Sequence, residues 1–395
     1  MEPKKFLLLA EQRKILHHAV AVQKRTLLPA DAVPSNKSKN GSCSLKRSNF
    51  CFKTSMSQLF AFQWHITDTC DQRCKHCYIF AENTNKSITS MTFEQMKMVI
   101  DNCIDFCNKF NRQPYFYITG GDPILHKNFW VLLEIVKEKN IEFTILGNPF
   151  HLTDEVCKNL KSYGCEQYQM SLDGLKQTHD WFRKNGSFDT TLEKIKCIKN
   201  AGINSAIMAT VSEKNINEIV GLIDVVVKYK VDTFAFARYC ATSLEKDINI
   251  EPLQYRIFLD KCYKKFQQYK DSGTFFDFKD HLWTLYLYEN GLFEIPKDAQ
   301  EGMIYDGCNC GNSHITICSN GDLLACRRFN SKVGNVFENK IANVWLNEME
   351  QYRNYDKFEK CSKCELLAYC RGCPAVAYGK THNFYSADPQ CWKQC

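Results

Sequence analysis

Three cysteines near residue 70 have a spacing that can hold an iron–sulfur cluster. Cys70, Cys74 and Cys77 form a C-x3-C-x2-C pattern, which puts three thiolates on one short loop. Three thiolates can hold three irons of a 4Fe–4S cube and leave the fourth iron open to a substrate or cofactor. A zinc knuckle is the alternative, although zinc needs a fourth ligand such as His76 and usually takes two C-x2-C pairs.

The cysteine loop resembles the signature of the radical S-adenosylmethionine (SAM) superfamily, in which the open iron binds the methionyl amine and carboxylate of SAM. This resemblance implies a reduced cube that cleaves SAM to methionine and a 5′-deoxyadenosyl radical, which removes a hydrogen from an unactivated carbon. Cys70, Cys74 and Cys77 would then be the catalytic residues, and Tyr78 would lie at the cofactor.

Two further segments resemble the motifs that bind SAM in this superfamily. Gly120, Gly121 and Asp122 match Gly-Gly-Glu-Pro, with Asp122 in place of the glutamate that receives the methionyl amine. Glycines also let the backbone approach a ligand closely. Ser171 and Arg183 match a serine and an arginine that hold the SAM carboxylate and ribose, and a planar guanidinium can bond both carboxylate oxygens. Weaker candidates for the pocket wall, at the ends of expected strands, are Asn148 and Thr210.

Ten of the 22 cysteines lie beyond residue 300. The run C-x2-C-x5-C-x2-C from Cys361 to Cys373 resembles the SPASM domain of peptide-modifying radical SAM enzymes, which typically carries two further 4Fe–4S clusters. The resemblance implies that four cysteines hold an outer cluster: Cys361, Cys364, Cys370 and Cys391. It implies that three more, with Cys308, hold an inner cluster: Cys310, Cys326 and Cys373.

The C-terminal block departs from the family pattern in two places. Two residues instead of three separate Cys370 from Cys373, and only Asn309 separates Cys308 from Cys310. Joint ligation of one cube by Cys308 and Cys310 would be strained, so one of them is expected to be free and the inner cluster to have an open iron. Structural zinc is the alternative, because C-x2-C pairs are common zinc ligands.

Composition favours a cytoplasmic enzyme. The 395 residues are 44% hydrophobic and 24% charged, enough for a large core and one or two domains. Disulfide-dense proteins are small and exported, whereas the apolar run after Lys5 is too short for a signal peptide. No stretch has the roughly 18 apolar residues of a membrane span. Despite a net charge of +7, no Lys/Arg run with interleaved aromatic residues indicates nucleic acid.

Three regions are expected along the chain: an N-terminal arm or adaptor with one helical pattern at 6–24 (1–56), a barrel (57–300) and the cysteine-rich block (301–395). Within the barrel region, helical runs separate six β-rich runs: 60–66, 115–119, 143–146, 167–172, 205–211 and 233–237. Thr92 and Gln95 form a capping box. This α/β pattern predicts a parallel sheet with helices outside, closed into a full or partial barrel. With the resemblance, it becomes a partial (β/α)6 radical SAM barrel followed by a C-terminal SPASM iron–sulfur domain.

Most of the other cysteines are expected to be small apolar core residues. They are Cys103, Cys107, Cys157, Cys165, Cys197, Cys240 and Cys262. The chemistry itself is expected at the carboxyl ends of the strands, because the cysteine loop directly follows the first of them.

The resemblance implies a cysteine-containing precursor peptide as substrate and a low-potential flavodoxin- or ferredoxin-type electron donor. Thioether cross-linking is favoured; carbon–carbon cross-linking and epimerisation stay open. Sulfatase maturases have an aspartate after the cysteine that matches Cys326, whereas this chain has Arg327. A non-catalytic iron–sulfur or zinc protein is a remote alternative, because its cysteine loop, glycine turn and Arg183 should have decayed.

Overall fold

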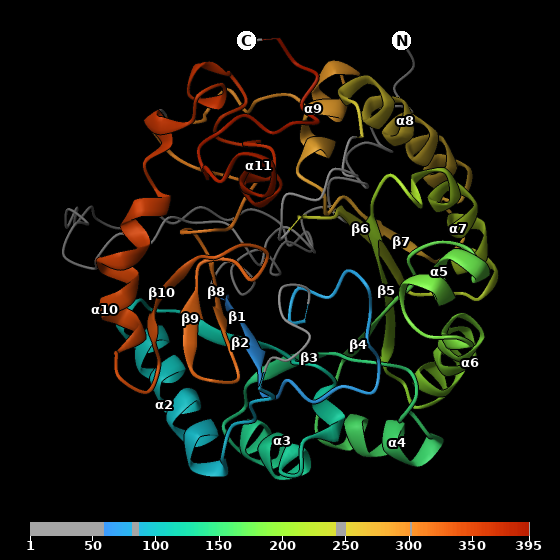
Figure 1. Ribbon diagram of the computed structural model, residues 1–395, viewed down its shortest axis with the longest axis vertical. Helices are drawn as coiled ribbons and strands as arrows, with labels where there is room; N and C mark the ends of the chain where they lie inside the picture. Colours follow the sequence, from blue (N-terminus) through green and yellow to red (C-terminus); the bar gives the residue numbers. More distant parts are fainter. Residues whose placement is uncertain (1–58, 81–86, 242–249, 301, 395) are drawn as a thin grey trace, which may run out of the picture.

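The computed structural model describes residues 59–80, 87–241, 250–300 and 302–394; the segment 1–56 and its expected helix lie outside them. The described residues contain a sheet that joins strands from the first and last parts of the chain (Figure 1). In spatial order its strands are β10 (Lys332–Asn335), β9 (Asp322–Leu324), β8 (His314–Ile317), β1 (Leu59–His65), β2 (Gln113–Thr119), β3 (Glu142–Leu146), β4 (Gln167–Ser171), β5 (Asn204–Val211), β6 (Thr233–Arg238) and β7 (Phe275–Asp277).

Strands β1 to β6 form the predicted parallel sheet. Each pairs in parallel with the next strand along the chain, and helices surround the sheet on its outer side (Figure 1). Strand β1 is buried along nearly its whole length, as expected for a parallel strand that packs on both faces. The predicted partial (β/α)6 barrel is confirmed, and the sheet stays open.

Helices separate the strands of the barrel, as the sequence predicts, and others follow β6. Their bounds are α2 (Phe93–Lys109), α3 (Phe129–Glu138), α4 (Asp154–Ser162), α5 (Lys176–Phe182), α6 (Ser187–Asn200), α7 (Ile216–Lys228), α8 (Pro252–Gln268), α9 (Leu282–Glu289), α10 (Ile341–Leu346) and α11 (Pro374–Thr381). Thr92 and Gln95 exchange the two hydrogen bonds of the predicted capping box at the start of α2. Among the described residues, no helix is long and apolar enough to cross a membrane.

The buried faces of these elements contain most of the cysteines that the sequence analysis assigned to the core. Cys103 and Cys107 lie on the inner face of α2 and are almost completely buried. Three others are fully buried: Cys157, Cys165 and Cys262. Cys197 is only partly buried. These cysteines act as small apolar side chains.

The cysteine-rich C-terminal region adds strands to the sheet of the barrel. Strand β8 pairs in parallel with β1, and β9 and β10 continue the sheet in antiparallel fashion. The two regions predicted as consecutive units, 57–300 and 301–395, therefore share one sheet. This pairing places the first C-terminal strand directly beside the strand that leads into the cysteine loop.

A buried ion-pair network also ties the end of β6 to the C-terminal residues. Arg238 donates hydrogen bonds to Asp280 through Nε at 2.9 Å, to Asp388 through Nη1 at 2.6 Å and to Gln390 at 2.9 Å. The Arg238 side chain is only 1% exposed. Asp388 also accepts a hydrogen bond from the backbone N–H of Cys373 at 2.6 Å. The network therefore positions one of the predicted cluster ligands.

Removing one member of this network should destabilise the protein strongly. We expect Asp388→Ala to lower the free energy of unfolding by about 3–5 kcal/mol, because it leaves a buried guanidinium short of a partner. Asp105→Ala is the control, since Asp105 pairs with Lys340 on the surface with 59% of its side chain exposed. This exposed pair should contribute less than about 1 kcal/mol. Anaerobic denaturant unfolding measures both, and equal losses would show that the network contributes little.

Candidate functional site

A cavity of about 200 Å³ lies at the carboxyl ends of the barrel strands, where the chemistry was expected. The cysteine loop forms one wall, and residues of the C-terminal region contribute to another. Eight residues predicted to bind the SAM cluster or SAM line it: Cys70, Cys74, Cys77, Tyr78, Gly120, Gly121, Ser171 and Arg183. The two weaker candidates also line it: Asn148 and Thr210.

The two glycines allow the cysteine loop to pack against the end of β2. The backbone N–H groups of Gly121 and Asp122 donate hydrogen bonds to the carbonyl oxygens of Thr67 and Thr69 at 2.7 and 2.8 Å. A Cβ atom at Gly121 would lie 2.2 Å from the Thr69 oxygen, and Gly120 has a φ of +152°. The sequence predicted that the glycines let the backbone approach a ligand closely. In the structure they also let the backbone of the cysteine loop pack directly on the glycine turn.

Arg183 connects a buried carboxylate to the cysteine loop. Its Nε donates a hydrogen bond to Asp173 at 2.5 Å, and its Nη1 donates one to the Cys74 sulfur at 3.7 Å. Asp173 is fully buried and also pairs with His76 of the loop at 3.3 Å. Although burial opposes its ionised form, Arg183 and His76 hold the pKa of Asp173 well below its usual range. The guanidinium therefore stays charged at the cavity wall.

Burial dominates the electrostatics of the three loop thiols. It raises the pKa of Cys70, Cys74 and Cys77 above the ordinary value, while Asn148 opposes this shift at Cys70 and Arg183 opposes it at the other two. Asn148 Nδ2 donates a hydrogen bond to the Cys70 sulfur at 3.2 Å. Thiols of raised pKa are weak nucleophiles but lose their protons on binding a metal. The loop is therefore suited to hold iron.

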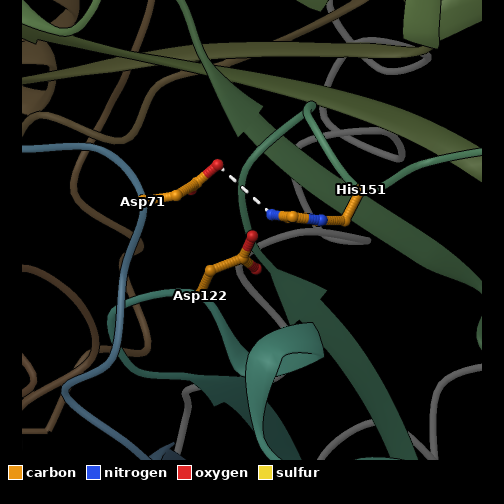
Figure 2. A group of neighbouring side chains, drawn as sticks. All are labelled: Asp71, Asp122 and His151. Carbon is orange, nitrogen blue, oxygen red and sulfur yellow. Dashed lines mark hydrogen bonds and ion pairs between the residues drawn. The ribbon is translucent and has the colours of Figure 1, made fainter.

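The carboxylate of Asp122, predicted to receive the SAM amine, is not among the groups that line the cavity. Its side chain is fully buried, and neither carboxylate oxygen has a hydrogen-bond partner in the described part of the chain. Burial and the nearby Asp71 carboxylate raise the pKa of Asp122 to about 7. Figure 2 shows that the carboxylate lies beside Asp71 and His151. The Gly-Gly-Asp-Pro motif does not reveal which way the Asp122 side chain points.

Several residues of the cavity wall were not predicted as site residues, among them Cys240, Arg327 and Arg328. Cys240 was expected in the core, but it follows the end of β6, lines the cavity and packs in one cluster with Cys373. Its place just after a parallel strand was the signal for a cavity position. Arg327 donates a hydrogen bond to Gln63 and lies over the Tyr78 ring at 5.3 Å. This arginine thus contacts both the cysteine loop and β1.

The cysteines predicted to hold the inner cluster form a group beside this wall. The thiols of Cys308 and Cys310 shift each other's pKa, lowering that of Cys308 and raising that of Cys310. Burial raises the pKa of Cys326 to about 11, and the thiols of Cys308 and Cys373 add to this shift. Cys240 joins the same group, because Cys373 raises the pKa of its thiol. Five thiols are therefore available where the sequence analysis counted four.

The cysteines predicted to hold the outer cluster form a second group. The backbone N–H of Cys364 donates a hydrogen bond to the carbonyl of Cys361 at 3.0 Å, in the short turn η7 (Cys361–Lys363). Burial raises the pKa of Cys370, and the thiols of Cys361 and Cys391 raise it further. Cys361, Cys370 and Cys391 are thus electrostatic neighbours, although Cys391 lies far away in the sequence.

In the described residues, the spacing of the thiols argues against a single zinc ion in the cysteine loop or in the C-terminal region. Four thiolates on one zinc lie about 3.8 Å apart, because each Zn–S bond is about 2.3 Å long and the geometry is tetrahedral. Across the described residues, the only three Cys, His, Asp or Glu side chains with ligand atoms within 4.8 Å of one another are Asp71, Asp122 and His151. No cysteine belongs to this set. A larger iron–sulfur cube fits the donor set better.

Comparisons with known proteins agree with this geometry. Residues 64–226 match the radical SAM superfamily, and residues 308–374 match the SPASM iron–sulfur cluster-binding domain. The chain contains a radical SAM domain followed by a SPASM domain. It is therefore a radical SAM enzyme whose cofactors are SAM and 4Fe–4S clusters, with auxiliary clusters in the SPASM domain. Which cysteine holds which cluster stays a prediction.

Relatives of this radical SAM–SPASM chain act on different substrates. It is 24% identical over 392 residues to the Fe-coproporphyrin III synthase of Methanosarcina barkeri, covering 91% of this chain and 94% of that one. It is 26% identical over 347 residues to the subtilosin biosynthesis protein AlbA of Bacillus subtilis, covering 83% and 71%. SuiB of Streptococcus suis bound to S-adenosylmethionine shares the fold, with a TM-score of 0.67, 21% identity and coverage of 85% and 77%.

Proposed function

We propose that this radical SAM enzyme forms sulfur-to-carbon thioether cross-links in a ribosomally made, cysteine-containing peptide. The observation that carries the proposal is the shared cavity: the loop cysteines line one wall, and Cys240 and Arg327, the neighbours of the inner cysteines, line another. One substrate can therefore face both predicted cluster sites. The role of AlbA in the biosynthesis of the bacteriocin subtilosin and the structure of SuiB bound to its precursor peptide SuiA support a peptide as substrate.

The cofactors and the protein have separate tasks in this proposal. When bound, the reduced cluster and SAM supply a 5′-deoxyadenosyl radical that takes a hydrogen atom from an unactivated carbon. The three loop cysteines would hold the iron, and Asn148 fixes Cys70 through its hydrogen bond. Gly120, Gly121 and Ser171, which line the cavity, would contact SAM, and the Arg183 guanidinium would bind its carboxylate. Fixed geometry of this kind lowers the entropic part of the barrier.

The inner cysteines support a thioether product. Cys310 and His281 lower the pKa of the Cys308 thiol, whereas Cys308 raises that of Cys310. The protein can therefore retain one of these two thiols while the other binds iron. The inner cluster would then keep one position for the thiol of the substrate.

The product is tested with cysteine-containing peptides from any short open reading frames that neighbour the gene, incubated with SAM and a reductant. Each thioether removes one hydrogen atom from carbon, which the 5′-deoxyadenosyl radical takes, and one proton and one electron from the thiol. The C-terminal cysteines would hold the iron–sulfur cluster that accepts this electron. We therefore expect the peptide mass to fall by two hydrogens per link and alkylation to fail at the joined cysteine. A mass loss with every cysteine still alkylated would instead indicate a carbon–carbon link. An unchanged mass that rises by one in deuterium oxide would indicate epimerisation, with Cys240 placed to return the hydrogen.

A tetrapyrrole carboxylate substrate is the second candidate, because Arg327 and Arg328 line the cavity and, in the described part of the chain, pair with no carboxylate. The Methanosarcina relative, an Fe-coproporphyrin III synthase, makes this candidate specific. Anaerobic titration with iron coproporphyrin III, followed by its visible absorption, separates the two substrates. We expect that iron coproporphyrin III does not bind stoichiometrically to the protein. Tight binding that Arg327→Gln weakens tenfold or more would move the assignment to a tetrapyrrole.

A further inference from the structure

We propose that Asp71, Asp122 and His151 bind a divalent first-row transition-metal ion that is separate from the iron–sulfur clusters. Their ligand atoms all lie within 4.8 Å of one another, and Figure 2 shows the three side chains facing a common space. They follow the carboxyl ends of β1, β2 and β3, which are neighbours in the parallel sheet. The fold therefore brings them together from three separate segments.

The Asp122 carboxylate, at the buried side of this group, supports a cation site. Its side chain is 0% exposed, and both of its oxygens lack a hydrogen-bond partner among the described residues. A buried carboxylate without a partner is costly unless a cation or a proton neutralises it.

The other two side chains complete the site and leave an entry path. His151 Nε2 and Asp71 Oδ2 lie 3.2 Å apart, and their side chains are 39% and 27% exposed. Asn148 Nδ2 orients Asp71 with a hydrogen bond of 3.1 Å and also bonds to the Cys70 sulfur. The exposed Lys184 amine lies farther away, 3.9 Å from Asp71. An ion can thus enter from solvent and reach the buried Asp122.

The donor set indicates the class of ion. Two carboxylate oxygens and one imidazole nitrogen suit Mn²⁺, Fe²⁺ or Zn²⁺ better than Mg²⁺ or Ca²⁺, which prefer oxygen alone. A divalent ion would neutralise both carboxylates. Because Asn148 bonds to both Asp71 and Cys70, a bound ion would also restrain the cysteine loop. The site would therefore position the loop and take no part in the radical step.

Mn²⁺ is the probe of choice, because a hard ion competes poorly for cysteine thiolates. The full-length protein with its clusters reconstituted is titrated anaerobically with Mn²⁺, and free Mn²⁺ is followed by electron paramagnetic resonance. We expect one Mn²⁺ per chain in the unmodified protein and affinity at least tenfold weaker in His151→Asn and in Asp122→Asn. His382→Asn is the matched control, because His382 is exposed and distant in sequence from the site. It should bind Mn²⁺ like the unmodified protein.

Iron content and SAM affinity are measured on the same samples. We expect both site variants to retain their iron content. Asparagine has nearly the same shape as aspartate, so Asp122→Asn still tests the site if His151→Asn folds poorly. Binding of no Mn²⁺ by the unmodified protein, or equal binding by all variants, would overturn the proposal. So would an Asp122→Asn variant that loses SAM affinity but has unchanged Mn²⁺ binding, because Asp122 would then serve the SAM amine.

Discussion

Replacing Cys70, Cys74 and Cys77 together with alanine should remove about four of about twelve irons per chain and abolish SAM cleavage. The three thiols lie on one loop at one cavity, whereas the C-terminal cysteines form separate groups. Loss of the loop ligands should therefore leave both auxiliary clusters in place. Iron analysis of anaerobically reconstituted protein gives the count, and release of 5′-deoxyadenosine gives the activity.

Cys197→Ala is the control for this experiment. Cys197 lies on α6, is partly exposed and is assigned to no cluster. Its replacement should leave both iron content and SAM cleavage unchanged. Stoichiometric zinc in the C-terminal region, with only four irons per chain, would show that the SPASM cysteines of this chain do not bind iron–sulfur clusters.

Replacing Arg183 with lysine should weaken SAM binding by roughly ten- to a hundredfold, the loss of one charge-assisted hydrogen bond. Lysine keeps a positive charge next to the buried Asp173 but lacks the planar fork that bonds a carboxylate. Alanine is less suitable, because it would leave Asp173 with His76 as its remaining charged neighbour. Equilibrium titration of SAM on the cluster-loaded protein measures the effect.

The control for Arg183→Lys is Lys176→Ala, an exposed residue of α5 that pairs with Asp189. It should bind SAM like the unmodified protein. Iron content should stay near that of the unmodified protein in both variants. If Arg183→Lys binds SAM as tightly as the unmodified protein does, Arg183 only positions Asp173 and the cysteine loop.

Local patterns predict the barrel well because each of its elements follows from neighbouring residues. The six strands and the capping box of Thr92 and Gln95 lie close to where the sequence places them. The spacing of Cys70, Cys74 and Cys77 also fixes a ligand set without any tertiary information, since a short loop holds its thiols together. For the same reason the C-x2-C pairs indicated the SPASM domain.

Contacts between distant segments could not be predicted from the sequence. The pairing of β8 with β1 and the hydrogen bonds of Arg238 to Asp280 and Asp388 join residues far apart in the chain, which no periodicity encodes. Cys240 was assigned to the core because a lone cysteine after an apolar strand has the same pattern whether it packs inside or faces a cavity. The direction of the Asp122 side chain depends likewise on the loop that packs over it.

The most direct measurement of radical SAM chemistry is the fate of SAM itself. The anaerobically reconstituted protein is reduced with dithionite and incubated with SAM, and the products are separated by chromatography. We predict that 5′-deoxyadenosine and methionine appear in equal amounts, and that neither appears with the variant lacking Cys70, Cys74 and Cys77. Intact SAM after incubation with protein that carries its full complement of reduced clusters would contradict the assignment of this chain as a radical SAM enzyme.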